Sequence, residues 1–91
     1  MADIPKDEHQ PVEAWCDTTY IHAKLQNGVV LSVPLWWYPR VRAGTPAQRN
    51  SVWVSPGGLH WNELDEDVAI QGMFEGWKAK DAVPPVMDAA E

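Results

Sequence analysis

His60 and the acidic residues that follow it are the side chains whose types and spacing could do chemistry in this sequence. Asp65 and Asp67 lie close after His60, and an imidazole beside carboxylates can bind a metal or transfer a proton. A metal site needs three or four converging ligands, however, whereas carboxylates crowded on one polar segment mostly face solvent. We therefore expect no metal and no cofactor, and we interpret His60 and Trp61 as a structural pair that holds the arginines of the preceding segment.

A nucleophilic enzyme would need an activated serine or cysteine next to a base. The single cysteine, Cys16, precedes the first expected strand, while Ser51 and Ser55 lie near expected turns. The histidines show no spacing to these residues that is typical of a hydrolase family. The sequence therefore predicts that the protein is not an enzyme and has no catalytic residues. A cryptic metal-dependent enzyme is the less favoured alternative.

Acidic and basic residues are segregated along the chain. Its 13 acids and 7 bases give a net charge of −6, which divides into −4 over residues 1–20, +4 over 21–61 and −6 over 62–91. Phosphate backbones repel such a chain, so direct nucleic-acid binding is disfavoured. Two interpretations stay open: the arginines of the middle segment pair with the later acids inside the fold, or the acids form a patch that attracts a basic partner. The patch would contain Glu63, Asp65, Glu66, Asp67 and Glu75.

A β-hairpin is the clearest structural prediction. Residues 18–25 and 29–35 alternate between aliphatic and polar side chains around the turn Gln26-Asn27-Gly28. A three-residue loop pairs Leu25 with Val29 and places all the aliphatic residues on one face, so that Ala23 meets Leu31 and Ile21 meets Val33. This loop needs a positive φ at Gly28. Pro34 has no N–H, which predicts a sheet edge or a bulge there.

The rest of the chain predicts short elements. Thr45-Pro46-Ala47-Gln48 is a capping box that starts a helix from residue 46 to about 51. Extended pieces follow over residues 52–54 and 59–61, and a last helix over 69–75 ends at Gly76. We expect a small α+β fold with an antiparallel sheet (the hairpin plus one or two short strands) and two short helices. The expected organisation is a flexible acidic lead over 1–14, one α+β domain over 15–77 and a loosely ordered tail over 78–91.

Several motifs occur together in a characteristic order: Trp37-Tyr38-Pro39-Arg40, Thr45-Pro46-Ala47-Gln48-Arg49, His60-Trp61 and Leu64-Asp65-Glu66-Asp67. With them, residues 18–76 resemble a small bacterial family known as domain of unknown function twenty-four forty-two. The resemblance implies a small α+β fold, no enzymatic activity and an accessory role such as antitoxin service. Ala69 stands where that family often has a capping serine, which would allow the last helix to start at Asp67.

We therefore expect a non-catalytic, acidic protein-binding module. It would inhibit or neutralise a basic, nucleic-acid-handling protein partner, in the manner of an anti-CRISPR protein or an antitoxin, through the five acids of the patch. The alternative is a structural or regulatory subunit that pairs through a sheet edge near Pro34 or residues 52–54. We expect a cytoplasmic monomer or weak dimer without membrane contact, because no long apolar run is present. Structural roles fall to Gly28, Trp37, Pro39, Arg40, Thr45, Gln48, Arg49, His60 and Trp61.

Overall fold

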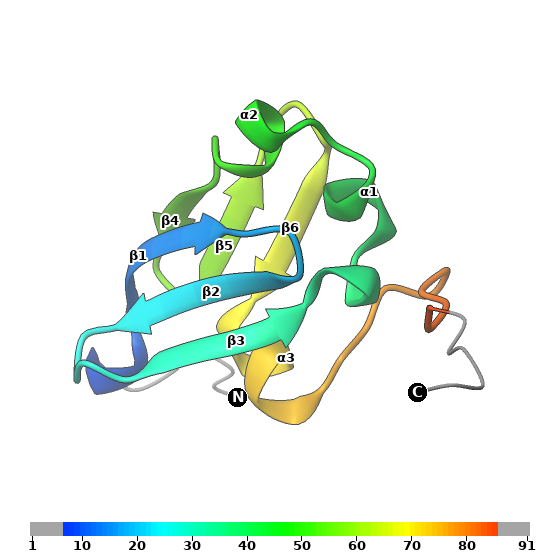
Figure 1. Ribbon diagram of the computed structural model, residues 1–91. Helices are drawn as coiled ribbons and strands as arrows, with labels where there is room; N and C mark the ends of the chain where they lie inside the picture. Colours follow the sequence, from blue (N-terminus) through cyan, green and yellow to red (C-terminus); the bar gives the residue numbers. More distant parts are fainter. Residues whose placement is uncertain (1–6, 86–91) are drawn as a thin grey trace.

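Two three-stranded antiparallel sheets form the framework of the computed structural model, which describes residues 7–85 (Figure 1). The first sheet has the order β1 (Pro11–Cys16), β2 (Tyr20–Leu25), β3 (Val30–Pro34). The second has the order β4 (Trp53–Ser55), β5 (Gly58–Trp61), β6 (Glu66–Ala69). The α+β class is confirmed, with two sheets where one was expected. The remaining elements are short: η1 (Asp7–His9), η2 (Leu35–Trp37), α1 (Pro39–Arg42), α2 (Pro46–Arg49) and α3 (Ile70–Glu75).

The β2–β3 hairpin has the register that the aliphatic pattern predicts. Ile21 lies opposite Val33 and Ala23 opposite Leu31. At the turn, the Leu25 N–H donates to the Val29 carbonyl (2.8 Å). Gly28 has a φ of 92°, in the left-handed region that only glycine enters without a Cβ penalty. One register therefore buries every inward side chain of β2.

The expected flexible lead is wrong over the residues that precede the hairpin. Residues 7–9 form η1, and Pro11–Cys16 is the strand β1, which pairs with β2 through Ala14 opposite Ala23. A register shift between Pro11 and Glu13 interrupts the alternation of side chains. Because of this irregularity and the acidic composition of the segment, the sequence pattern did not predict a strand here. Residues 1–6 of the expected lead lie outside the described residues.

The middle of the chain connects the two sheets through short helices. The Thr45–Gln48 capping box is confirmed, with both reciprocal hydrogen bonds present, and α2 ends at Arg49, slightly earlier than expected. The Trp61 indole N–H donates to the Arg49 carbonyl (2.9 Å), so β5 holds the end of α2. Residues 53–55 and 58–61 are strands, as the extended pieces predict. Together these contacts fix the β5–β6 hairpin beside α2.

The last helix begins later than the sequence suggests. Residues 66–69 form the strand β6, with Asp67 opposite His60, so the expected start at Asp67 is wrong. Pairing with β5 satisfies backbone groups that an uncapped helix start would leave open. The helix ends as predicted at Gly76, whose φ is 81°. The chain then docks on the body, because the Ala79 N–H donates to the Trp37 carbonyl (2.9 Å). Residues 86–91 of the expected tail lie outside the described residues.

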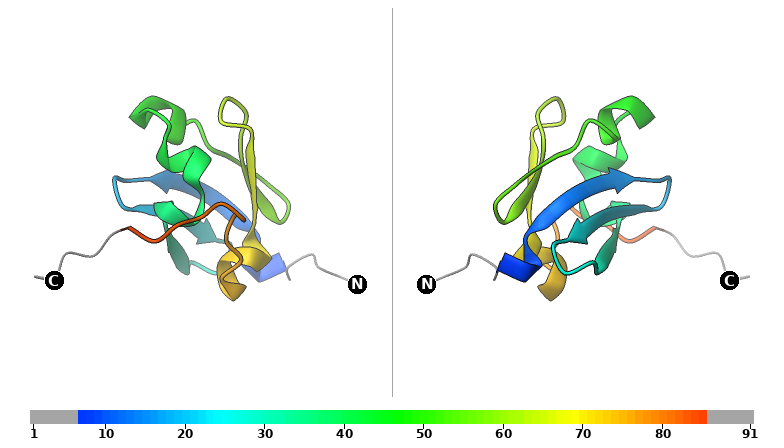
Figure 2. Two further views of the ribbon diagram at one scale, coloured as in Figure 1. Left: turned by 90° about the vertical axis from the view of Figure 1, so that its right-hand side faces the viewer. Right: turned by 90° about the vertical axis from the view of Figure 1, so that its left-hand side faces the viewer.

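The hydrophobic core lies between the two sheets, which Figure 2 shows side by side with α3 at one end. Its most deeply buried large side chains come from both sheets and from α1 and α3: Ile21, Leu25, Val41, Leu59, Trp61 and Ile70. Among residues 7–85, no helix is long and apolar enough to cross a membrane. The core thus leaves one face of each sheet turned outward, and most of the polar residues considered below lie on these outward faces, on the loops or on the short helices.

Candidate functional site

Four of the five acids of the expected patch lie on the β5–β6 connection and on β6. We call Glu63, Asp65, Glu66 and Asp67 the acidic hairpin. Its turn is closed by the Asp65 N–H, which donates to the Asn62 carbonyl (3.3 Å). Asp65 has a φ of 54°, and aspartate is one of the few side chains that tolerate this left-handed conformation. Asp65 therefore has a local structural reason to be present in addition to its charge.

Two acids of the acidic hairpin have neighbours on α1 and α2. A carboxylate oxygen of Asp65 lies 3.6 Å from Arg40 Nη1, which also donates to the Asp65 carbonyl (2.6 Å). Glu63 accepts a hydrogen bond from Gln48 Nε2 (3.2 Å). The Asp65 side chain is 96% exposed and that of Arg40 59% exposed. Solvent screening limits the contribution of such a surface pair to the stability of the fold to about 0–1 kcal/mol.

The other acids are directed to different sides of the molecule. Successive strand residues point to opposite faces, so Glu66 lies on the side of Trp61 and Asp67 on the side of His60. Burial raises the pKa of Glu66, and the nearby Arg40 partly opposes this shift. Glu75 lies at the end of α3, away from the hairpin tip (Figures 1 and 2). The five acids of the expected patch are therefore not brought together on one face.

The arginines and aromatic residues given structural roles have backbone partners or ring contacts. Arg49 Nη1 donates to the carbonyls of Gly44 (2.5 Å) and Arg42 (3.3 Å), and these hydrogen bonds fix the loop between α1 and α2. Trp37 lies with its ring centroid 4.9 Å from Lys78 Nζ and edge-on to its aromatic neighbours, Trp36 and Tyr38. Pro39 is the first residue of α1. Among the described residues, the only arginine–carboxylate pair is Arg40 with Asp65.

We expected His60 and Trp61 to form a pair that holds the arginines, but His60 does not take part in such a pair. It lies on the opposite face of β5 from the buried Trp61, between two polar partners. Its Nδ1 is 2.7 Å from Asp67 Oδ1, and its Nε2 is 2.5 Å from Ser55 Oγ. Trp53 packs on the imidazole with ring centroids 4.4 Å apart. We call Ser55, His60 and Asp67 the second-sheet relay.

Sequence reasoning missed the part that Ser55 plays in this relay. The signal was available in the short turn between β4 and β5, which places Ser55 opposite Gly58 and Trp53 opposite His60. The β6 strand then adds Asp67 in the same row. Gly58 gives the imidazole its room, because a Cβ at this position would lie 3.3 Å from His60 Nε2.

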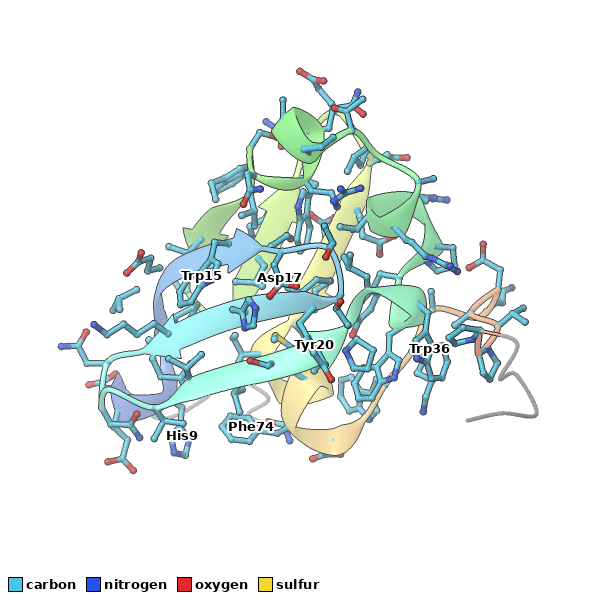
Figure 3. All side chains as sticks on the ribbon, viewed as in Figure 1. His9, Trp15, Asp17, Tyr20, Trp36 and Phe74 are labelled. Carbon is cyan, nitrogen blue, oxygen red and sulfur yellow. The ribbon has the colours of Figure 1, made fainter. Side chains whose placement is uncertain are left out.

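A related set of groups lies on the outward face of the first sheet. His22 Nε2 is 2.8 Å from Asp17 Oδ2, its Nδ1 is 2.6 Å from Ser32 Oγ, and Trp15 stacks on the ring at 5.2 Å. Figure 3 shows Trp15, Asp17 and Tyr20 on this face. The hydrogen bond from His22, with those from the Thr19 and Tyr20 N–H groups, lowers the pKa of Asp17 to about 2. We call Asp17, His22 and Ser32 the first-sheet relay.

Each relay contains two side chains of the kinds that ligate metals, one histidine and one aspartate. In the part of the chain from residue 7 to residue 85, no three His, Cys, Asp or Glu side chains come together in a way that could hold a metal ion. Each relay instead joins one imidazole to one carboxylate and one hydroxyl. Such an arrangement can fix the position of the imidazole and move a proton along it.

Comparison with known proteins places this fold in a family. The model of a family described as "Protein of unknown function (DUF2442)" matches residues 11–79. The chain belongs to the DUF2442 family. The matched region begins with the first residue of β1 and ends at Ala79, which docks on Trp37, so the DUF2442 unit includes residues 11–14 of the expected lead and residues 78–79 of the expected tail.

A solved structure supports the fold of this DUF2442 protein. A protein of unknown function from Rhodospirillum rubrum ATCC 11170, known from a crystal structure, is similar with a TM-score of 0.70. The two chains share 23% identity, and the similarity covers 80% of this chain and 93% of the other. A search of curated proteins gave no match. These findings establish the family and the architecture of the chain.

Proposed function

We propose that this DUF2442 protein is a protein-binding module whose acidic hairpin occupies a basic surface on a nucleic-acid-handling partner. Occupation of that surface would inhibit or neutralise the partner, as anti-CRISPR proteins and antitoxins do. The observation that carries the proposal is the charge left on the hairpin. Four carboxylates have one arginine within ion-pair distance, so 4 − 1 leaves an excess of three negative charges on one projecting loop and strand.

Position and exposure support this role. The turn of the hairpin lies at an end of the molecule, beside α2, and projects beyond the body of the two sheets (Figure 2). Asp67 is 81% exposed and Asp65 96% exposed, so their charges reach solvent. Opposite charge speeds the encounter of two proteins and makes it sensitive to salt within a Debye length of about 8–10 Å. A basic groove that normally contacts phosphates has the complementary field.

A matched pair of charge variants tests the proposal. The triple variant E63Q/D65N/E66Q removes three hairpin charges and leaves Asp67 and its relay intact. The control D7N/E8Q/E13Q makes the same three kinds of change in η1 and β1, where all three side chains are exposed. Tagged wild type and variants are used to capture proteins from the source organism, at low and high salt, with quantitative mass spectrometry.

The proposal expects one basic, nucleic-acid-binding protein that the wild type and the control retain and the hairpin variant loses. Purified, that partner should bind more weakly as salt rises, and its nucleic acid should compete with the module. Equal capture by the hairpin variant would overturn the proposal. Capture that is equally reduced by both triple variants would show a general effect of net charge and would also overturn it.

A second candidate function is the binding of a partner protein through the edge of the first sheet. β3 is an edge strand of its sheet in the described chain; its first residue, Val30, is 46% exposed, and the preceding Val29 is 49% exposed. An extended segment of a partner can add to such an edge, although Pro34 at its end offers no N–H. This mode predicts binding that is insensitive to salt and to the hairpin variant, and that Val30→Lys abolishes.

A further inference from the structure

We propose that the second-sheet relay is an acyl-transfer site, in which the Ser55 hydroxyl attacks small carboxylic esters. This inference does not rest on the proposed binding function: it concerns the reactivity of Ser55 and His60, and Asp67 is the one residue that the two proposals share. The three side chains have the mutual geometry that nucleophilic catalysis requires: a hydroxyl within hydrogen-bond reach of a base, and a base oriented by a third group. The separations are 2.5 Å from Ser55 Oγ to His60 Nε2 and 2.7 Å from His60 Nδ1 to Asp67 Oδ1.

The assignment of roles follows from which imidazole nitrogen each partner meets. Asp67 accepts from Nδ1, which leaves Nε2 as the acceptor that faces the Ser55 hydroxyl. Trp53 covers one side of the ring and restricts its rotation. His60 is therefore the general base, and Asp67 is a positioning residue that selects the tautomer.

A pocket of about 300 Å³ lies next to the Ser55 side chain. Its wall includes Gly57 and Gly58, which carry no side chains, together with Val68 and Ala69. The missing Cβ atoms leave space for an acyl group next to the hydroxyl. A Cβ at Gly58 would also crowd the imidazole at 3.3 Å, so this glycine preserves both the pocket and the base.

The first-sheet relay has the same three residue types in a different arrangement. There the hydroxyl, Ser32, meets Nδ1 of His22, close to the histidine's own backbone, where a tetrahedral intermediate has little room. Its carboxylate, Asp17, is bound by two backbone N–H groups and helps to shape the β1–β2 turn. We therefore assign reactivity to Ser55 alone, and the first-sheet relay becomes an internal control.

The reaction balances without any external redox partner. The Ser55 proton moves to His60 Nε2 as the Oγ–carbon bond forms, the bond from the acyl carbon to the leaving oxygen breaks, and the leaving alcohol takes the proton from Nε2. Water then adds to the acyl carbon, with His60 accepting its proton, and Ser55 leaves and recovers that proton. The Gly57 N–H is already bonded to Gln10 Oε1 (2.7 Å) and does not stabilise the oxyanion. We therefore expect reaction with activated aryl esters rather than with unactivated alkyl esters.

Labelling of the complete chain with 4-nitrophenyl acetate tests the inference. Peptide mass spectrometry maps the acetyl group, and release of nitrophenolate measures the rate. We expect one acetyl group on Ser55 in the wild type, no acetylation of that peptide in Ser55→Ala, and acetylation slowed by at least about 100-fold in His60→Gln. Ser32→Ala, the matched change in the first-sheet relay, should leave the labelling of Ser55 unchanged.

Asp67→Asn separates positioning from a structural role. It should slow acetylation of Ser55 while the melting temperature stays that of the wild type, because it alters the tautomer of His60 without changing the shape of the sheet. The inference is overturned by a wild type in which Ser55 is unlabelled, or labelled no faster than Ser32. It is equally overturned by a His60→Gln variant that is folded and labels Ser55 at the wild-type rate.

Discussion

Replacement of Trp61 by phenylalanine should test how the chain holds the acidic hairpin in place. The Trp61 side chain is 1% exposed and sits in the core between the two sheets. Its indole N–H donates to the Arg49 carbonyl at 2.9 Å, which connects β5 to the end of α2. Phenylalanine retains most of the apolar contact but removes this donor and leaves a small void.

Both losses reduce the free energy of unfolding. A partly buried carbonyl that loses its donor costs about 1–2 kcal/mol. The smaller ring adds about 1 kcal/mol through the cavity that it leaves. We therefore expect Trp61→Phe to lower the stability by about 2–3 kcal/mol, out of a total of roughly 5–14 kcal/mol for a chain of this length.

Urea unfolding followed by far-UV circular dichroism measures this change without relying on tryptophan fluorescence, to which six residues contribute. Trp77→Phe is the matched control, because Trp77 is 53% exposed and should tolerate the same change within about 0.5 kcal/mol. If the two variants differ by less than about 1 kcal/mol, the connection from Trp61 to α2 does not carry the stability that we assign to it.

Four further predictions follow from single positions. Gly28→Ala should cost about 1–2 kcal/mol in urea unfolding through backbone strain alone, since φ is 92° and nothing lies within 4 Å of the new Cβ; Gly28→Asn should cost less. Thr45→Ala should cost about 1 kcal/mol in the same assay by removing the cap of α2. The pKa of Asp17 is lowered from 3.8 to about 2, so its contribution is present above pH 4 and is lost as the pH falls towards 2; acid unfolding of Asp17→Asn should lack this loss. Burial raises the pKa of Cys16 to about 11, so iodoacetamide at pH 8 should alkylate it only after urea unfolding.

The hairpin and the caps could be predicted from the sequence because each depends on nearby residues. Only one loop length puts Ile21, Ala23 and Leu25 on the same face as their partners, so the pattern determines the register. The capping box needs only Thr45 and Gln48, and the end of α3 needs only Gly76. These features follow from local geometry, and the structure confirms them.

The strands β1 and β6 could not be predicted in the same way because their partners decide them. The first contains a register shift after Pro11, and the second begins with two acids that favour a helix start in isolation. Pairing with β2 and β5 overrides these local preferences. The second-sheet relay was missed for the same reason, since Ser55, His60 and Asp67 meet only after β4, β5 and β6 align.

The charge of the acidic hairpin depends on the fold more than on the count of acids. Asp65 shares its charge with Arg40, Asp67 is hydrogen-bonded to His60, and burial favours the neutral form of Glu66. The field at the hairpin is therefore weaker than four free carboxylates would give. The affinity of a partner bound to this surface should therefore fall less steeply with salt than the affinity of one that contacts four independent charges. Glu63 is hydrogen-bonded to the neutral Gln48, so its charge should contribute the largest single share of this salt dependence.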